Sequence, residues 1–234
     1  MTCYGVSTRL LAACLAAHGD DRGLVLPSAI AQVQVVIVPL LKKGEATYAE
    51  CAAMKVATEI SAALKQSGVR VFIDDSEQKP APKYYHWEMR GVPVRIEIGE
   101  KDMEKGVVTL VRRDMEGRDA KQAIPQSDIV KVVHDAFRVQ LDGMRARAAQ
   151  YLQDHIAQCS TLDEVTAAMK KGGFARIPFI SMGHDAKDAE AIIREHTGGE
   201  VRGYVPTEVP PAAGVNCLVS GKQATVWAYV ARAY

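Results

Sequence analysis

Apolar residues follow two different spacings along this chain, and each spacing predicts a type of element. Residues 32–40 are almost all apolar and β-branched, which is typical of a strand buried on both faces of a sheet. Residues 46–66 carry small and apolar side chains every three or four positions, which predicts a helix that ends near Gly68. Residues 69–73 predict another strand. Because a helix lies between the two strands, we expect them to pair in parallel.

The following segment predicts helices and strands in a different order. A helix is expected at 8–17 and a short one at 82–90. Alternating apolar positions predict strands at 92–98 and 107–111, joined by a turn at 99–105, and these form an antiparallel pair. Ser127 is a good N-cap for a long helix from 128 to about 158, in which Gly143 marks a bend or a domain boundary.

The last third of the chain predicts a second, smaller α/β unit. Thr161-Leu-Asp-Glu164 fits a capping box, and Gly172-Gly173 ends that helix. We expect strands at 177–180 and 201–205, a helix at 185–197 and a closing β-hairpin at 216–230. The fold class is therefore α/β, with two domains.

Composition and charge narrow the class of protein. The chain is 48% hydrophobic and 24% charged, which is ordinary for a soluble globular protein, and no apolar run approaches the length of a membrane span. The five cysteines are scattered, so neither a disulfide framework nor a metal site is indicated, and a cytoplasmic setting is expected. A net charge of +1 provides no overall attraction to nucleic acid.

Arg9 is the first residue that could carry chemistry. A guanidinium on a rigid element can bind phosphates bidentately, and small neighbours such as Gly5 and Ser7 let a nucleotide approach the backbone. The sequence Gly-Val-Ser-Thr-Arg at 5–9 is equally typical of a turn that leads into a helix with a surface arginine.

Two blocks together resemble one family. The segment 4–9, followed by His-Gly-Asp-Asp-Arg-Gly-Leu-Val-Leu-Pro at 18–27, is similar to the third signature motif of class II aminoacyl-tRNA synthetases in its prolyl form, of the archaeal and eukaryotic type. Trp-Glu-Met-Arg-Gly-Val-Pro-Val-Arg at 87–95, continuing Glu-Ile-Gly-Glu-Lys-Asp at 97–102, resembles the anticodon-binding domain of prolyl-tRNA synthetases.

The resemblance implies positions that read the anticodon of tRNA(Pro): Glu88, Arg95, Lys101 and Lys121. Proline codons begin with two cytosines, so the anticodon ends in two guanines. A guanine offers N1–H and N2–H₂ donors to a carboxylate and O6 and N7 acceptors to arginine or lysine, and unstacked bases are read on these edges. A solvated, charged strand edge is the alternative interpretation of such residues. Trp87 is more typical of a core than of a stacking platform.

The same resemblance extends to the end of the chain. The segment 172–179 and the final 227–234, which end in Tyr234, are similar to the C-terminal domain of this synthetase subgroup. Zinc-binding relatives have two cysteine pairs there, whereas this chain has only Cys217 in the corresponding turn. One thiolate cannot form a tetrahedral site, so we expect no zinc.

The implied organisation is a tail of the class II catalytic domain at 1–27, an anticodon-binding domain with a mixed five-stranded sheet at 28–143, and a zinc-less C-terminal domain at 144–234. The full-length enzyme implied by the family is a homodimer that uses ATP and Mg²⁺ to join proline to tRNA(Pro). Arg9 would contact the ATP phosphates, while Gly5 and Ser7 would line the adenylate pocket. The first two class II motifs are not among these residues, so the chain lacks the rest of its catalytic domain and is expected to be inactive alone.

An alternative stays open at this point. The same fold could serve as a free-standing adaptor or regulatory module that uses its sheet for protein contacts. The coding sequence directly upstream of Met1 distinguishes the two, because an open frame with class II motifs favours the synthetase. A small-molecule α/β enzyme is disfavoured, since the chain has no phosphate loop and no nucleophile motif.

Overall fold

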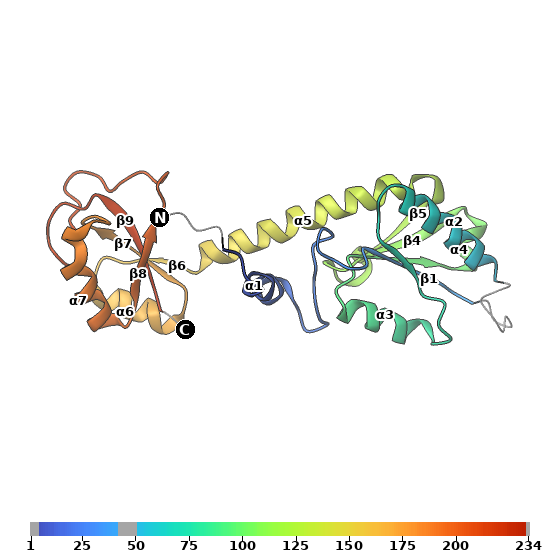
Figure 1. The fold of residues 1–234 in the computed structure, drawn as a ribbon, viewed down its shortest axis with the longest axis horizontal. Helices are drawn as coiled ribbons and strands as arrows, with labels where there is room; N and C mark the ends of the chain where they lie inside the picture. Colours follow the sequence, from blue (N-terminus) through green and yellow to red (C-terminus); the bar gives the residue numbers. More distant parts are fainter. Residues whose placement is uncertain (1–4, 42–50, 233–234) are drawn as a thin grey trace. The chain divides into compact units, whose positions relative to one another are not determined.

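The computed structural model describes residues 5–41 and 51–232, and it divides into two compact units, Met1–Ala148 and Ala149–Tyr234. Figure 1 shows a sheet with helices in each unit. The unit boundary, between Ala148 and Ala149, lies within helix α5 (Ile129–Asp154). The ends of the chain at 1–4 and 233–234 and the segment 42–50 lie outside the described residues.

A mixed five-stranded sheet forms the centre of the first unit, in the order β2-β1-β3-β4-β5. The strands are β1 (Val35–Pro39), β2 (Val71–Ile73), β3 (Val94–Ile98), β4 (Val107–Arg112) and β5 (Lys121–Pro125). Strand β1 pairs in parallel with β2 and β3, whereas β4 is antiparallel to β3 and β5. This confirms the predicted parallel pair, the predicted antiparallel pair and the mixed sheet.

The two faces of this sheet are covered differently. Helix α2 (Ala52–Gln66) and helix α5 pack on one face, where Ile37, Ile96, Leu110 and Phe137 belong to a large apolar core. Helix α3 (Pro80–Met89) lies on the opposite side of the sheet (Figure 1), where Trp87 joins Val36 and Val38 in a smaller cluster. The second face is therefore apolar beneath α3 and leaves room for polar side chains on β3, β4 and β5.

Several boundaries differ from the sequence-based expectation. The turn expected at 99–105 contains a short helix, α4 (Glu100–Glu104), and a 3₁₀ turn at Gly117–Ala120 precedes β5. The first helix, α1, spans Arg9–His18 and buries none of its residues. The start of the helix expected at 46–66 falls partly outside the described residues, and α2 ends at Gln66 as expected.

The second unit contains a four-stranded sheet in the order β6-β7-β9-β8. Its strands are β6 (Ile156–Gln158), β7 (Phe174–Phe179), β8 (Glu200–Tyr204) and β9 (Val226–Ala231), and its helices are α6 (Leu162–Lys171) and α7 (Lys187–Thr197). One bond of the expected capping box is present, because the Thr161 hydroxyl accepts a hydrogen bond from the Glu164 N–H at 3.2 Å. The Glu164 carboxylate accepts from the N–H of Ser160, one residue before the N-cap, at 2.6 Å. The expected α/β class with a second, smaller sheet is confirmed.

Two elements of this unit correct the expectation. The long helix does not reach 158, because the chain leaves it after Asp154 to form β6, which pairs with β7. The final hairpin also takes a different form. Residues 216–219 contribute only a single bridge between Asn216 and Gln223, and β9 pairs antiparallel with the preceding strand β8 and with β7.

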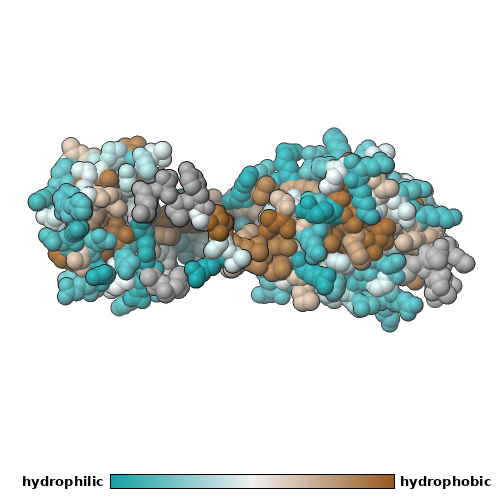
Figure 2. Space-filling view, viewed as in Figure 1, coloured by the Kyte–Doolittle hydropathy of each residue, from teal (hydrophilic) through white to brown (hydrophobic). Residues whose placement is uncertain are grey.

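The visible face of the units is mostly hydrophilic, with hydrophobic patches between the polar areas (Figure 2). In the described part of the chain, no helix combines the length and the apolar character that a membrane crossing requires.

Candidate functional site

Four residues lie in one row across the polar part of the first sheet. Strand register places Arg95 of β3 beside Val36 of β1 and opposite Val111 of β4, and Val111 opposite Lys121 of β5. Residues that pair directly across strands point to the same face of a sheet. The pairing of the strands therefore brings Arg95 and Lys121, which are 26 positions apart in the sequence, onto one surface.

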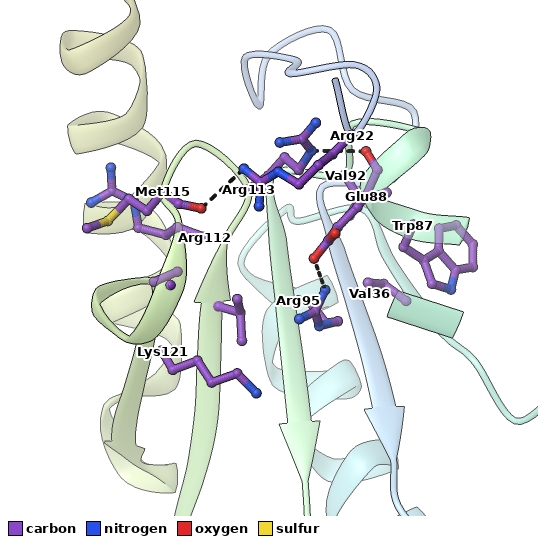
Figure 3. A pocket seen from close by; sticks show the side chains of 13 residues that line it. Arg22, Val36, Trp87, Glu88, Val92, Arg95, Arg112, Arg113, Met115 and Lys121 are labelled. Carbon is purple, nitrogen blue, oxygen red and sulfur yellow. Dashed lines mark hydrogen bonds and ion pairs between the residues drawn. The ribbon is translucent and has the colours of Figure 1, made fainter. Parts of the chain in front are cut away.

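This surface borders a cavity of about 150 Å³. Its lining includes Glu88 from α3, Arg95 from β3 and Lys121 from β5, together with the apolar side chains of Val36 and Val92. Figure 3 shows the Glu88 carboxylate directed at the Arg95 guanidinium. Three of the four residues that the resemblance implied as base readers thus come from three elements and meet at one cavity.

The charged groups at the cavity form a continuous network. The Arg95 Nη1 donates to Glu88 Oε1 at 2.9 Å, and its Nε donates to Glu97 Oε1 at 3.1 Å. The Lys121 Nζ donates to Glu97 Oε2 at 3.0 Å. The Tyr84 ring lies under Arg95, with 4.1 Å between its centroid and the guanidinium carbon. Such contacts hold a long cationic side chain in one orientation.

Lys101 does not belong to this cavity. It is exposed on α4, which begins two residues after β3 ends. The structure therefore separates Lys101 from the other three proposed base readers, and its role remains a prediction.

The cavity is also lined by three arginines that the sequence did not single out: Arg22, Arg112 and Arg113. The Arg113 side chain is only 1% exposed, and it binds both oxygens of Asp20, at 2.7 and 2.5 Å. Its Nε donates to the backbone carbonyl of Glu88 at 3.0 Å. Arg113 therefore fixes the backbone that carries Glu88. The adjacent basic residues after an apolar strand were the available signal, but the sequence does not show which of them is buried.

Asp20 is affected strongly by this contact. The hydrogen bonds from Arg113 lower the pKa of the Asp20 carboxyl far below its usual range, burial opposes this, and Arg22 adds to the lowering. The segment that follows α1 is thus joined to the cavity by a charged pair that persists across the physiological pH range.

Trp87 belongs to the core rather than to an exposed stacking surface. It is 6% exposed, and its Nε1 donates to Asp74 Oδ2 at 2.7 Å. The interpretation of Trp87 as a core residue therefore agrees with the structure.

The residues of the first motif are accessible. Gly5 and Ser7 precede α1 and Arg9 begins it, and all three are exposed. The first residue of the motif, Tyr4, lies outside the described part of the chain, as does Tyr234. The roles of Gly5, Ser7 and Arg9 toward ATP stay predictions.

Cys217 is buried in a tight turn of the second unit, where its N–H donates to the Lys222 carbonyl at 2.7 Å. Burial raises the pKa of the Cys217 thiol, but hydrogen bonds from Ser220 and from nearby backbone N–H groups outweigh it and lower the pKa. Within residues 5–41 and 51–232, no three His, Cys, Asp or Glu side chains are grouped to hold a metal. The absence of zinc remains a prediction.

Comparisons with known families match both units. A family model described as "Anticodon binding domain" matches residues 34–136, and one described as "Prolyl-tRNA synthetase, C-terminal" matches residues 162–234. The first match contains all five strands of the first sheet, and the second contains β7, β8 and β9.

Curated relatives match the entire chain, and a solved structure matches nearly all of it. A proline–tRNA ligase of Methanothrix thermoacetophila is 40% identical over 240 residues, and one of Methanococcoides burtonii is 37% identical over 234 residues. Both alignments cover 100% of this chain and 46% of the relative. A structure of Giardia lamblia prolyl-tRNA synthetase in complex with prolyl-adenylate matches with a TM-score of 0.87 and 34% identity, covering 98% of this chain and 48% of that one. The chain spans about half the length of the curated relatives it matches.

Proposed function

The chain belongs to the prolyl-tRNA synthetase family, and we propose that its first unit recognises the anticodon of proline tRNA at the cavity bordered by Glu88, Arg95 and Lys121. Residues 28–143 are assigned to the anticodon-binding domain and residues 144–234 to the C-terminal domain. The activity in which this recognition takes part is the joining of proline to its tRNA with ATP and Mg²⁺ by a cytoplasmic, homodimeric full-length enzyme.

One observation carries the proposal. A hydrogen-bond acceptor and two donors, from α3, β3 and β5, line a single cavity. A guanine edge presents the complementary groups: N1–H and N2–H₂ donate to a carboxylate, and O6 and N7 accept from arginine or lysine. Glu88 is only 19% exposed and Arg95 9% exposed at the side chain, so a bound base would meet these groups largely shielded from water.

The sheet gives the readers a rigid support. The backbone of β3 is fixed by β1 and β4, and its other face is packed into the large apolar core through Val94, Ile96 and Ile98. Groups held in place before binding lose less conformational entropy on binding, and a base in the wrong register meets unmatched polar groups.

Anticodon binding can be tested with the chain and a set of proline tRNAs. The anticodon ends in two guanines, and we expect a change of either one to weaken binding. Glu88→Ala and Arg95→Ala should each cost about 1–3 kcal/mol toward the guanine-containing tRNA and reduce the preference for guanine. The measurement is a binding titration at a fixed salt concentration, because phosphate contacts make affinity depend on salt.

Two matched controls lie on α2, which covers the opposite face of the sheet. Glu59→Ala and Lys55→Ala remove an exposed carboxylate and an exposed ammonium, respectively, and both variants should bind like the wild type. Equal wild-type affinity for all anticodons would contradict the proposed function and favour the adaptor interpretation.

A further inference from the structure

Glu97 lies behind the cavity and contacts two of the cations that line it. It is two residues from Arg95 on β3, so both side chains point to the same face of the sheet. The Glu97 side chain is 8% exposed, whereas that of Lys121 is 51% exposed. Glu97 itself is not part of the cavity's lining. Its carboxylate is therefore placed to act on its neighbours rather than on a bound base.

Both cations bind the Glu97 carboxylate. Oε1 accepts from the Arg95 Nε at 3.1 Å and lies 3.0 Å from Arg95 Nη2, while the Lys121 Nζ donates to Oε2 at 3.0 Å and at a longer distance, 3.4 Å, to Oε1. A buried carboxylate is unfavourable unless it is paired and hydrogen-bonded. Here the two cations that compensate for its burial are also two of the three proposed base readers.

Arg95 is consequently held from three sides. Glu97 binds its Nε and Nη2, Glu88 binds its Nη1, and the Tyr84 ring packs under the guanidinium plane. Lys121 has a flexible four-carbon stem and would otherwise sample many rotamers. Its ammonium is 3.0 Å from Glu97 and 5.9 Å from the centre of the Tyr84 ring. The entropy of ordering both cations is thus lost on folding rather than on binding RNA.

We propose that Glu97 is a positioning residue for base recognition: without contacting RNA, it holds the Arg95 and Lys121 side chains toward the cavity in the geometry that reads guanine. This inference rests on the proposed function, and it adds a residue to which the sequence assigned no role.

One substitution changes the affinity for tRNA in opposite directions under a positioning role and under simple electrostatics. Glu97→Gln removes a negative charge beside a polyanion, so charge alone predicts tighter binding to every tRNA. A positioning role predicts that affinity for the guanine-containing anticodon falls about tenfold, while affinity for the guanine-substituted anticodons stays constant or rises. The ratio of the two affinities is the quantity to measure, in the same titration that tests the proposed function.

Two further variants keep the test decisive. Glu97→Asp retains the charge but shortens the side chain, so the fold should persist while the affinity ratio falls. Glu59→Gln, on the opposite side of the sheet, makes the same chemical change as Glu97→Gln at an exposed position and should leave the ratio unchanged. Thermal unfolding of each variant shows whether it is folded at the titration temperature.

Coupling to the readers provides the last check. If Glu97 acts through Arg95 and Lys121, then Glu97→Gln should not lower the ratio further in an Arg95→Ala/Lys121→Ala background. A wild-type chain that prefers guanine, together with Glu97 variants that keep the full preference, overturns the role of Glu97 and leaves the proposed function intact. A wild-type chain without any preference overturns both.

Discussion

Asp74 follows β2 directly and joins the edge of the sheet to α3. Its Oδ2 accepts from Trp87 Nε1 at 2.7 Å, its Oδ1 accepts from the Ser76 hydroxyl at 2.6 Å, and the Lys83 ammonium is 3.5 Å from Oδ1. Burial raises the pKa of Asp74, but the hydrogen bonds from Ser76 and Trp87, helped by the charge of Lys83, outweigh it and lower the pKa.

Because its pKa is lowered, the contribution of Asp74 to the stability of the fold depends on pH in a defined direction. The ionised carboxylate stabilises the fold at pH values above the ordinary carboxyl pKa of about 3.9, and this stabilisation is lost as pH falls through the lower folded-state pKa. We expect Asp74→Asn to reduce the free energy of unfolding by about 1–3 kcal/mol at pH 7, with a smaller difference from the wild type in acid. Urea unfolding at pH 7 and at a pH below the ordinary carboxyl pKa of about 3.9 measures this difference. The exposed neighbour Asp75 provides the control, Asp75→Asn, and a difference that does not change with pH would contradict the prediction.

The residues at the cavity show what a sequence can reveal at this scale. The family pattern grouped Glu88, Arg95 and Lys121, and these three do line one cavity, whereas Lys101 stands apart on α4. The pattern gave no role to Glu97 or Arg113. Glu97 alternates with apolar residues on β3, and a charged residue in such a position usually faces water, whereas Arg113 directly follows β4. Only the cover provided by neighbouring elements shows that both are buried.

At the scale of elements, strong periodicity was a good predictor and short elements were not. The helices at 9–18 and 80–89 and four strands of the first sheet, β1 to β4, were found within a few residues, whereas no strand was predicted at the position of β5. Strand β6 has three residues, too few for a periodic signal, and it forms because its backbone pairs with β7. Partner choice at the end of the chain likewise depends on distant segments, which is why β9 pairs with β7 and β8.

The segment that follows α1 docks against the end of α3 through a glycine. Gly23 has a φ of +128°, and a Cβ placed there would lie 2.5 Å from the Met89 Cα. The next residue, Leu24, donates its N–H to the Met89 carbonyl at 3.1 Å. Neither the backbone conformation nor the available space accommodates a side chain at position 23.

We therefore expect Gly23→Ala to lower the free energy of unfolding of the first unit, by about 1–3 kcal/mol for the backbone conformation and further for the clash with Met89. Gly106 has a φ of +65°, and no atom lies within 4 Å of the position that a Cβ would take there, so Gly106→Ala carries the backbone cost alone. Urea unfolding compares the two. If Gly23→Ala costs no more than Gly106→Ala, the close approach to Met89 does not matter for stability.

At the scale of the whole molecule, charge is organised locally. The net charge of +1 gives no indication of RNA binding, yet four arginines and a lysine line one cavity, balanced by the carboxylates that orient them. Bulk composition therefore could not reveal the site. The resemblance to a family revealed it, and strand register explains how its parts meet.

The exposure of the first motif leads to a prediction for the chain as a whole. Arg9, Gly5 and Ser7 are exposed, and α1 buries none of its residues, so a phosphate held by Arg9 would be surrounded by water, which weakens each charged contact. A polypeptide of these 234 residues is expected to show no proline-dependent exchange of pyrophosphate into ATP while still binding proline tRNA. The archaeal relatives serve as the positive control, and exchange activity that remains with the purified chain would contradict this expectation.

The unequal cover of the first sheet also has a consequence for protein engineering. The face toward α2 and α5 supplies the large apolar core, whereas Arg95 and Lys121 project from the other face of the same strands and Glu88 projects from α3. Substitutions at positions 88, 95 and 121 therefore leave that core untouched. If Arg95 and Lys121 are replaced, Glu97 has to be replaced as well, because its buried carboxylate would otherwise lose the cations that it binds. This part of the sheet is a scaffold on which base preference could be redesigned while the fold is retained.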